Sequence, residues 1–193
     1  MRFEKGHKAA TRQHILEVAS KRFRHEGISA AGIAGIMAEA GLTNGAFYPH
    51  FASKEELVRE TLASALGDHQ HRLEESLRGC HELEGVIRNY LSREHLRNPA
   101  CGCPSAALLP EIARQPSPTR QAYEEGLQSY ISVLAAQLPD ADSAVAGRRA
   151  TAIFALMVGT LQLARAVTGA ANAERMLEGG VEAALLLART PPA

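Results

Sequence analysis

Residues 41–58 gather an unusual number of side chains that suit contacts with a nucleic acid. The segment reads Gly-Leu-Thr-Asn-Gly-Ala-Phe-Tyr-Pro-His-Phe-Ala-Ser-Lys-Glu-Glu-Leu-Val. A carboxamide such as that of Asn44 can bond an adenine edge twice, and the Tyr48 ring can meet a thymine methyl group. His50 and Lys54 suit hydrogen bonds to phosphate, which position a protein on the duplex without reading its sequence. The segment therefore predicts a surface that both reads bases and grips the backbone.

Two further residues of this segment act through the backbone. Thr43 stands where an N-cap belongs, so its hydroxyl can cap a short helix or contact phosphate. Gly45 has no side chain, which lets the main chain approach a groove closely. Each candidate also has a structural reading: Thr43 as a cap alone, Tyr48 as half-buried structure and His50 as a structural histidine. The complete set of candidate DNA contacts is Thr43, Asn44, Gly45, Tyr48, His50 and Lys54.

Elements with helical periodicity must position these side chains. Nearly every segment between breaking residues has apolar residues at helical spacing, and none alternates like a strand. The pattern predicts an all-α fold of about nine helices. Their expected ranges are about 8–25, 31–40, 43–49, 53–79, 82–97, 105–114, 117–138, 143–167 and 172–189.

The first helices have the layout of a helix-turn-helix. Gly27 is expected to end the first helix in the usual C-terminal glycine position, and Gly41 to form the next turn. Pro49 disfavours helix for the residue before it and stops the third helix early. Ser53 and Glu56 form a capping box that begins a long helix. In such a motif the second helix enters the DNA major groove.

Residues 10–60 also resemble a known family. The run Gly-Leu-Thr-x-Gly-Ala-Phe-Tyr-x-His-Phe-x-Ser-Lys-Glu-Glu-Leu is similar to the signature of tetracycline-repressor (TetR) family regulators. The resemblance implies a repressor of double-stranded operator DNA that is released by a small-molecule effector. It also implies that the six candidate residues contact DNA. The expected domains are a helix-turn-helix domain over residues 1–58 and a ligand-binding and dimerisation domain over residues 59–193.

The second helix departs from the family pattern. The family usually begins this helix with Thr or Ser, whereas here the sequence reads Ala30-Ala31-Gly32. A good N-cap is absent, and each glycine inside the helix costs about 1 kcal/mol relative to alanine. Phosphate contacts from the start of this helix are therefore not expected.

The penultimate helix has a composition that bears on whether the chain forms a dimer. Residues 152–164 are apolar almost all round, which requires burial on more than one side. A central core helix and a subunit interface both satisfy this requirement. The resemblance favours the second, because TetR-type proteins dimerise through a four-helix bundle of their last two helices. Residues that suit this packing are Ala152, Ala155, Gly159 and Thr160, with Met176, Leu177, Gly180, Val181 and Ala184 from the last helix.

The second domain offers few polar features for an effector site. The resemblance implies a ligand bound between its helices, and the sequence contains no tryptophan. An apolar cavity lined by aromatic residues is the expectation. The aromatic candidates are Tyr90, Tyr123, Tyr130 and Phe154.

Cysteines and histidines could instead make the protein a redox-sensing or metal-sensing regulator. Cys101 and Cys103 stand in a loop near His95, and Cys80 precedes another helix. Their spacing is not that of a zinc site, which wants paired ligands. Ordinary structural thiols are the alternative. His69, His71 and His81 are expected to be solvated, and no metal site is expected.

Composition separates the remaining function classes. Lys+Arg and Asp+Glu both number 21, but residues 1–25 carry seven bases against two acids, a basic arm that would attract phosphate.

The uncharged run 150–164 is too short to span a bilayer, and no secretory segment is present. The chain is expected to be cytoplasmic, without a membrane partner. No catalytic triad, P-loop or dinucleotide fingerprint appears, so neither enzyme activity nor a cofactor is expected. An activator remains an alternative to a repressor.

Overall fold

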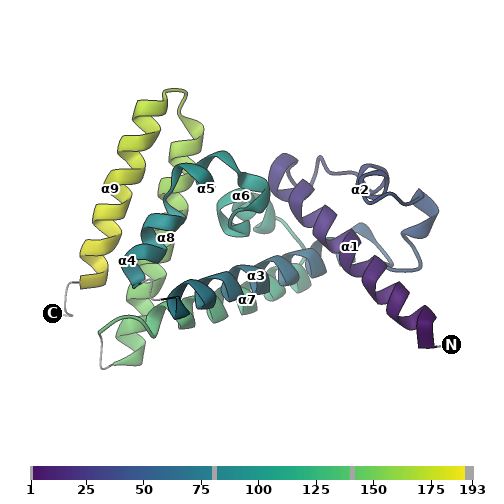
Figure 1. Cartoon of the computed structure of the whole chain (residues 1–193), viewed down its shortest axis with the longest axis horizontal. Helices are drawn as coiled ribbons and strands as arrows, with labels where there is room; N and C mark the ends of the chain where they lie inside the picture. Colours follow the sequence, from purple (N-terminus) through teal and green to yellow (C-terminus); the bar gives the residue numbers. More distant parts are fainter. Residues whose placement is uncertain (1, 80–81, 140–141, 190–193) are drawn as a thin grey trace.

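The computed structural model describes residues 2–79, 82–139 and 142–189 (Figure 1). Over these ranges all regular elements are helices and there is no strand, which confirms the all-α prediction. It forms nine α-helices and two short 3-10 helices within these ranges. In chain order they are α1 (Arg2–Glu26), α2 (Ile33–Glu39), η1 (Asn44–Ala46), α3 (Lys54–Arg78), α4 (Leu83–Tyr90), α5 (Arg93–Arg97), η2 (Pro99–Cys101), α6 (Pro104–Ile112), α7 (Ser117–Ala135), α8 (Ser143–Ala166) and α9 (Ala170–Arg189).

Two glycines in left-handed conformations shape the N-terminal end. Gly27 has a φ of 93° and ends α1, while Gly41 has a φ of 70° and turns the chain after α2. Residues with a Cβ are disfavoured at both φ values, so glycine permits these turns. Helices α1, α2, η1 and the start of α3 enclose one apolar cluster, to which α6 contributes Leu108 and Ile112.

The long helix α3 connects this end to the rest of the molecule. The Glu56 amide donates to Ser53 Oγ at 3.2 Å, and the Ala52 amide donates to the Glu56 carboxylate at 2.6 Å, so the predicted capping residues begin the helix. Helix α7 lies along α3 (Figure 1). Helix α3 runs without a break through the expected boundary at residues 58 and 59. The division into two domains there stays a prediction.

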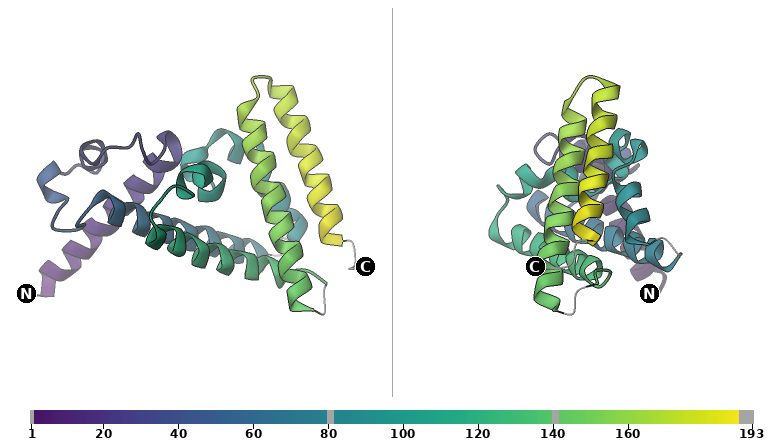
Figure 2. Two further views of the ribbon diagram at one scale, coloured as in Figure 1. Left: turned by 180° about the vertical axis from the view of Figure 1, so that it is seen from behind. Right: turned by 90° about the vertical axis from the view of Figure 1, so that its left-hand side faces the viewer.

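Helices α8 and α9 form a hairpin at the opposite end of the molecule from α1 (Figure 2). They close a second and larger apolar cluster with α4 and α7. By length and composition alone, α8 could also cross a membrane, a test that core helices of other proteins pass too. Here one face of α8 packs against α7 and α9.

Two expected helices differ from the prediction. Residues 43–49 contain only η1, with amides of Ala46 and Phe47 donating three residues back, because Pro49 has no amide proton to continue a helix. The single helix expected over residues 82–97 is divided into α4 and α5. Ser92 breaks it, since its hydroxyl accepts from the His95 amide at 3.2 Å and begins a new helix.

Candidate functional site

The segment around η1 presents one exposed face and one buried face. Phe47 and Phe51 point into the N-terminal cluster, with 0% and 1% of their surface exposed. Their rings stack with centroids 5.6 Å apart, so they fix the segment against α1 and α3. The opposite face carries exposed Thr43, Asn44, Gly45 and Tyr48. Tyr48 is 68% exposed, which argues against its reading as half-buried structure.

The backbone candidates are also open to contact. The Thr43 hydroxyl makes no capping hydrogen bond to η1, so it is not used as a cap in this conformation. A Cβ built on Gly45 would meet nothing within 4 Å. The main chain at Gly45 therefore borders open space, as a close approach to a groove requires.

His50 and Lys54 lie beside this face. His50 is half-buried, and Lys54 already makes one hydrogen bond. Burial and the positive charges of Lys8 and Arg12 lower the pKa of His50, so its ring is neutral at neutral pH. It can therefore offer a phosphate a hydrogen bond but no charge. Lys54, in the first turn of α3, donates from Nζ to the Ser29 carbonyl oxygen at 3.5 Å. This contact is long and half-exposed, so the ammonium can exchange it for a phosphate.

The basic residues of α1 have mostly internal roles. Arg12 lies over the Phe51 ring, 4.5 Å from its centroid, and pairs with Glu60. Arg22 pairs with Glu26 and Arg24 bonds the Ala100 carbonyl. Among the described side chains of the expected basic arm, Lys8 and Lys21 are exposed. The local excess of positive charge thus contributes less to the outer surface than the sequence predicts.

The start of α2 offers no polar side chain, as predicted. Gly32 occupies its N-cap position without a side-chain hydrogen bond. The polar candidates at this end of the molecule therefore lie on the η1 segment and at the start of α3.

A cavity of about 260 Å³ opens between α3, α4, α7 and the segment that connects α5 to α6. Its inner wall consists of buried side chains, which are Leu73, Val86, Tyr90, Cys103 and Tyr130. Its rim carries exposed polar residues, which are Arg72, Asn89, Glu94 and Asn98. A polar rim above a buried wall is the usual construction of a small-molecule site.

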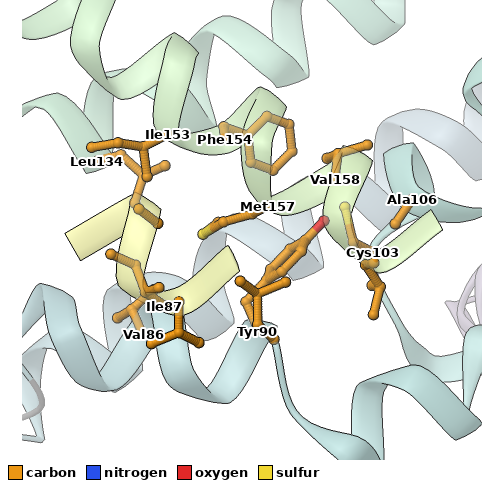
Figure 3. Packing of buried hydrophobic residues seen from close by; sticks show 14 of the residues in the cluster. Val86, Ile87, Tyr90, Cys103, Ala106, Leu134, Ile153, Phe154, Met157 and Val158 are labelled. Atoms are coloured by element: carbon orange, nitrogen blue, oxygen red, sulfur yellow. The ribbon is translucent and has the colours of Figure 1, made fainter. Parts of the chain in front are cut away.

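Two of the four aromatic candidates line this cavity. Tyr90 and Tyr130 form part of the inner wall. Phe154 packs against both rings, with centroids 6.2 and 4.9 Å away, and belongs to the core beside them (Figure 3). Tyr123 lies elsewhere, with its hydroxyl 2.9 Å from Ser105 Oγ and its ring against the N-terminal cluster.

His69 corrects the expectation that the histidines of the long helix are solvated. Its ring lines the cavity and packs against Tyr130 at a centroid distance of 4.7 Å. His71 is exposed as expected and lies 3.7 Å from the Glu74 carboxylate. The sequence could have distinguished the two histidines, because His69 follows Leu62 and Leu66 and precedes Leu73 on the apolar stripe of α3.

His95 serves a structural role that spacing alone could not reveal. Its Nε2 accepts from the Cys103 amide at 2.9 Å, so its Nδ1 carries the proton and donates to the Tyr90 carbonyl oxygen at 2.8 Å. Burial, with a smaller effect from the Arg165 charge, lowers the pKa of His95 to about 4. Both ring nitrogens are occupied, which leaves none for a metal. In the described ranges no three His, Cys, Asp or Glu residues cluster as metal ligands, and Cys80 and His81 lie outside those ranges.

Comparison with known proteins identifies the N-terminal part. The family described as bacterial regulatory proteins, tetR family, matches residues 15–61. The transcriptional regulator AcrR of Shigella flexneri is 46% identical over 50 residues, which are 26% of this chain and 23% of that protein. The repressor KstR2 of Mycolicibacterium smegmatis is 32% identical over 83 residues, 41% of this chain and 40% of its own length. The chain thus matches well under half the length of these relatives.

Solved structures extend the likeness to the whole fold. The reduced form of E. coli NemR has a TM-score of 0.75 at 21% identity, over 95% of this chain and 100% of the other. A TetR-family regulator of Cytophaga hutchinsonii has a TM-score of 0.74 at 20% identity, over 95% and 97%. At such low identity the likeness concerns the fold alone. The matched segment 15–61 contains η1 and its exposed face, so this part of the chain is similar to the tetR family of bacterial regulatory proteins, and the chain as a whole shares the fold of these solved structures.

Proposed function

We propose that this protein is a sequence-specific regulator of transcription, acting in the cytoplasm as a repressor rather than as an enzyme. The observation that carries the proposal is the exposed face of Thr43, Asn44, Gly45 and Tyr48, held outward by buried Phe47 and Phe51. It lies inside the segment that matches the tetR family. Curated relatives over this segment are named as helix-turn-helix transcriptional regulators or repressors, which supports the same role here.

Each residue of this face has a distinct part in the proposed complex. Asn44 bonds a base edge in the major groove, and Tyr48 contacts a thymine methyl group or a phosphate. Lys54 leaves its contact with the Ser29 carbonyl to pair with a phosphate at the start of α3. His50 adds a neutral hydrogen bond beside it.

An apolar surface on α8 and α9 supports assembly as a homodimer. On α8, residues 152, 155, 159 and 163 are exposed or half-exposed, at spacings that place them on one face turned away from the core. Leu163 is 62% exposed, and Met176 on α9 is 38% exposed. A second copy packed here would cover this face, in keeping with the family. Thr160 and Gly180, also expected at the interface, instead pack against each other within one chain.

The cavity and the DNA-binding end share one segment, which suggests how an effector releases DNA. Residues 101–103 line the cavity, and the neighbouring Ala100 carbonyl accepts from Arg24 Nε of α1 at 2.7 Å. Nearby, the Glu111 carboxylate of α6 accepts from the Ser29 amide at 3.0 Å. A ligand that changes the position of this segment would tilt α1 and the η1 face with it. It must bind the two conformations with different affinity to do so.

Affinity for the DNA upstream of the chain's own gene tests the proposal. Fluorescence anisotropy should show Asn44→Ala weakening binding by about 1–3 kcal/mol, the value of a good bidentate base contact. Lys54→Ala should weaken binding to all sequences alike and reduce its salt dependence. Gln128→Ala removes a matched carboxamide from the exposed side of α7 and should bind like the wild type. Wild-type affinity in both DNA-face variants would remove the assignment of this surface.

A further inference from the structure

The inner wall of the cavity carries a thiol beside two buried polar groups, the Tyr90 hydroxyl and Nε2 of the His69 ring, that bond no oxygen or nitrogen of the described residues. Cys103 is 1% exposed and sits at the N-terminus of α6. The Tyr90 hydroxyl points toward its sulfur (Figure 3). Tyr90 is 5% exposed, yet its hydroxyl, like Nε2 of His69, hydrogen-bonds to no oxygen or nitrogen of the described chain. Buried polar groups without such partners are rare and call for a functional explanation.

The surroundings of Cys103 activate its sulfur. Burial raises the pKa of the thiol, while the His69 imidazole, the Tyr90 hydroxyl and the Ala106 amide lower it further, to about 7. The lowered pKa favours the thiolate of Cys103 at neutral pH relative to an ordinary thiol. The thiolate is the nucleophilic form of cysteine, so Cys103 combines reactivity with a place inside a cavity.

The cavity itself selects the kind of reagent. Its 260 Å³ exceeds what a peroxide needs and suits a small organic molecule. Leu73, Val86 and Tyr130 give the inner wall an apolar surface, and the rim carries one positive and one negative side chain, Arg72 and Glu94. These features favour an uncharged, partly apolar carbon compound that reaches the thiol from the rim.

We propose that Cys103 is a covalent attachment site for a small uncharged carbon electrophile of the α,β-unsaturated carbonyl class. The thiolate sulfur forms a bond to the β-carbon, and the electron pair of the carbon–carbon double bond moves to give an enolate. A proton from water, equivalent to the one that the thiol lost, then adds to the α-carbon. The net reaction is addition of S–H across the double bond and needs no oxidant.

The adduct has a structural route to the DNA-binding end. The Cys103 amide donates to His95, and the carbonyl of Ala100, three residues earlier, holds Arg24 of α1. A group attached to the sulfur would occupy the cavity against this segment and so bias its position. Release of DNA by the adduct rests on the proposed function, whereas formation of the adduct does not.

The full-length protein treated with 2-cyclohexenone at neutral pH tests the attachment site. Peptide mass mapping over time should show Cys103 modified at least about tenfold faster than exposed Cys101, because the His69 imidazole and the Tyr90 hydroxyl favour the thiolate of Cys103. His69→Gln should slow modification of Cys103 several-fold, while His71→Gln, an exposed histidine on the same helix, should leave the rate unchanged. Faster modification of Cys101, or modification of Cys103 only after denaturation, overturns the proposal.

Two further arms separate the alternatives. If hydrogen peroxide converts Cys103 to a dimedone-reactive sulfenic acid while the enone leaves it unmodified, the site senses oxidants and the electrophile proposal is wrong. Fluorescence anisotropy with upstream DNA then measures the effect of the adduct on DNA affinity. Treatment with the enone should weaken binding at least tenfold in the wild type but not in Cys103→Ser. Failure of the unmodified protein to bind DNA would count against the proposed function alone, since the mass measurement still decides the attachment site.

Discussion

At the scale of single residues, the exposure of the candidate DNA contacts could be predicted because it is set locally. Asn44 and Tyr48 lie in one turn, so their exposure follows from the burial of Phe47 and Phe51 between and beside them. The cavity residues could be predicted only in part. Tyr90 and Tyr130 are among the four aromatic candidates, whereas Cys103 and His69 come from separate elements that only tertiary packing brings to the same wall.

His95 provides a prediction about pH and stability. Its pKa is about 4 in the folded protein against about 6.5 when unfolded, so the unfolded state binds the proton first as pH falls. Above pH ~6.5 the neutral His95 ring makes its full contribution to the free energy of unfolding. This contribution is lost as the pH falls toward ~4. Urea denaturation should show a loss of about 1–2 kcal/mol from this residue between about pH 7 and pH 5.

The matched variant for this test is His95→Gln, whose amide can replace both hydrogen bonds without titrating. Its stability should fall less steeply over the same pH range than that of the wild type. Parallel pH profiles for the two proteins would show that another group causes the loss.

At the scale of elements, most helices could be predicted because their signals lie within the segment itself. Gly27 ends α1 and Ser53 begins α3 as the sequence indicates. The break between α4 and α5 was missed, because apolar periodicity continues across it. Ser92 with His95 three residues on is a capping arrangement, but the bond from His95 to the Tyr90 carbonyl that secures it depends on the folded chain.

The apolar face of α8 gives a prediction about assembly. Leu163→Glu should convert the dimer to a monomer, because a carboxylate would be buried without a partner at the proposed interface. Sedimentation velocity measures the change directly. Leu109→Glu, which alters an exposed leucine of α6, serves as the control and should remain dimeric. An unchanged dimer in Leu163→Glu would mean that the copies meet through another surface.

At the scale of the whole molecule, the two proposed interaction surfaces lie at opposite ends. The η1 face lies at one end and the α8–α9 hairpin at the other, with the cavity between them (Figure 1). A dimer joined through the hairpins would present two η1 faces, which suits an operator with two related half-sites. The resemblance to the family indicated this layout, whereas the fold was needed to select Tyr90 and Tyr130 from the four aromatic candidates and to add His69 and Cys103 to the cavity wall.

Selection of preferred sequences from a random DNA pool, by the wild type and by Asn44→Ala, tests the central claim most directly. The account predicts that the wild type enriches a site with two inverted half-sites. It predicts that Asn44→Ala relaxes the preference at one base pair in each half-site and keeps the others. Enrichment of the same sequence by both proteins, or of no sequence by the wild type, would contradict it.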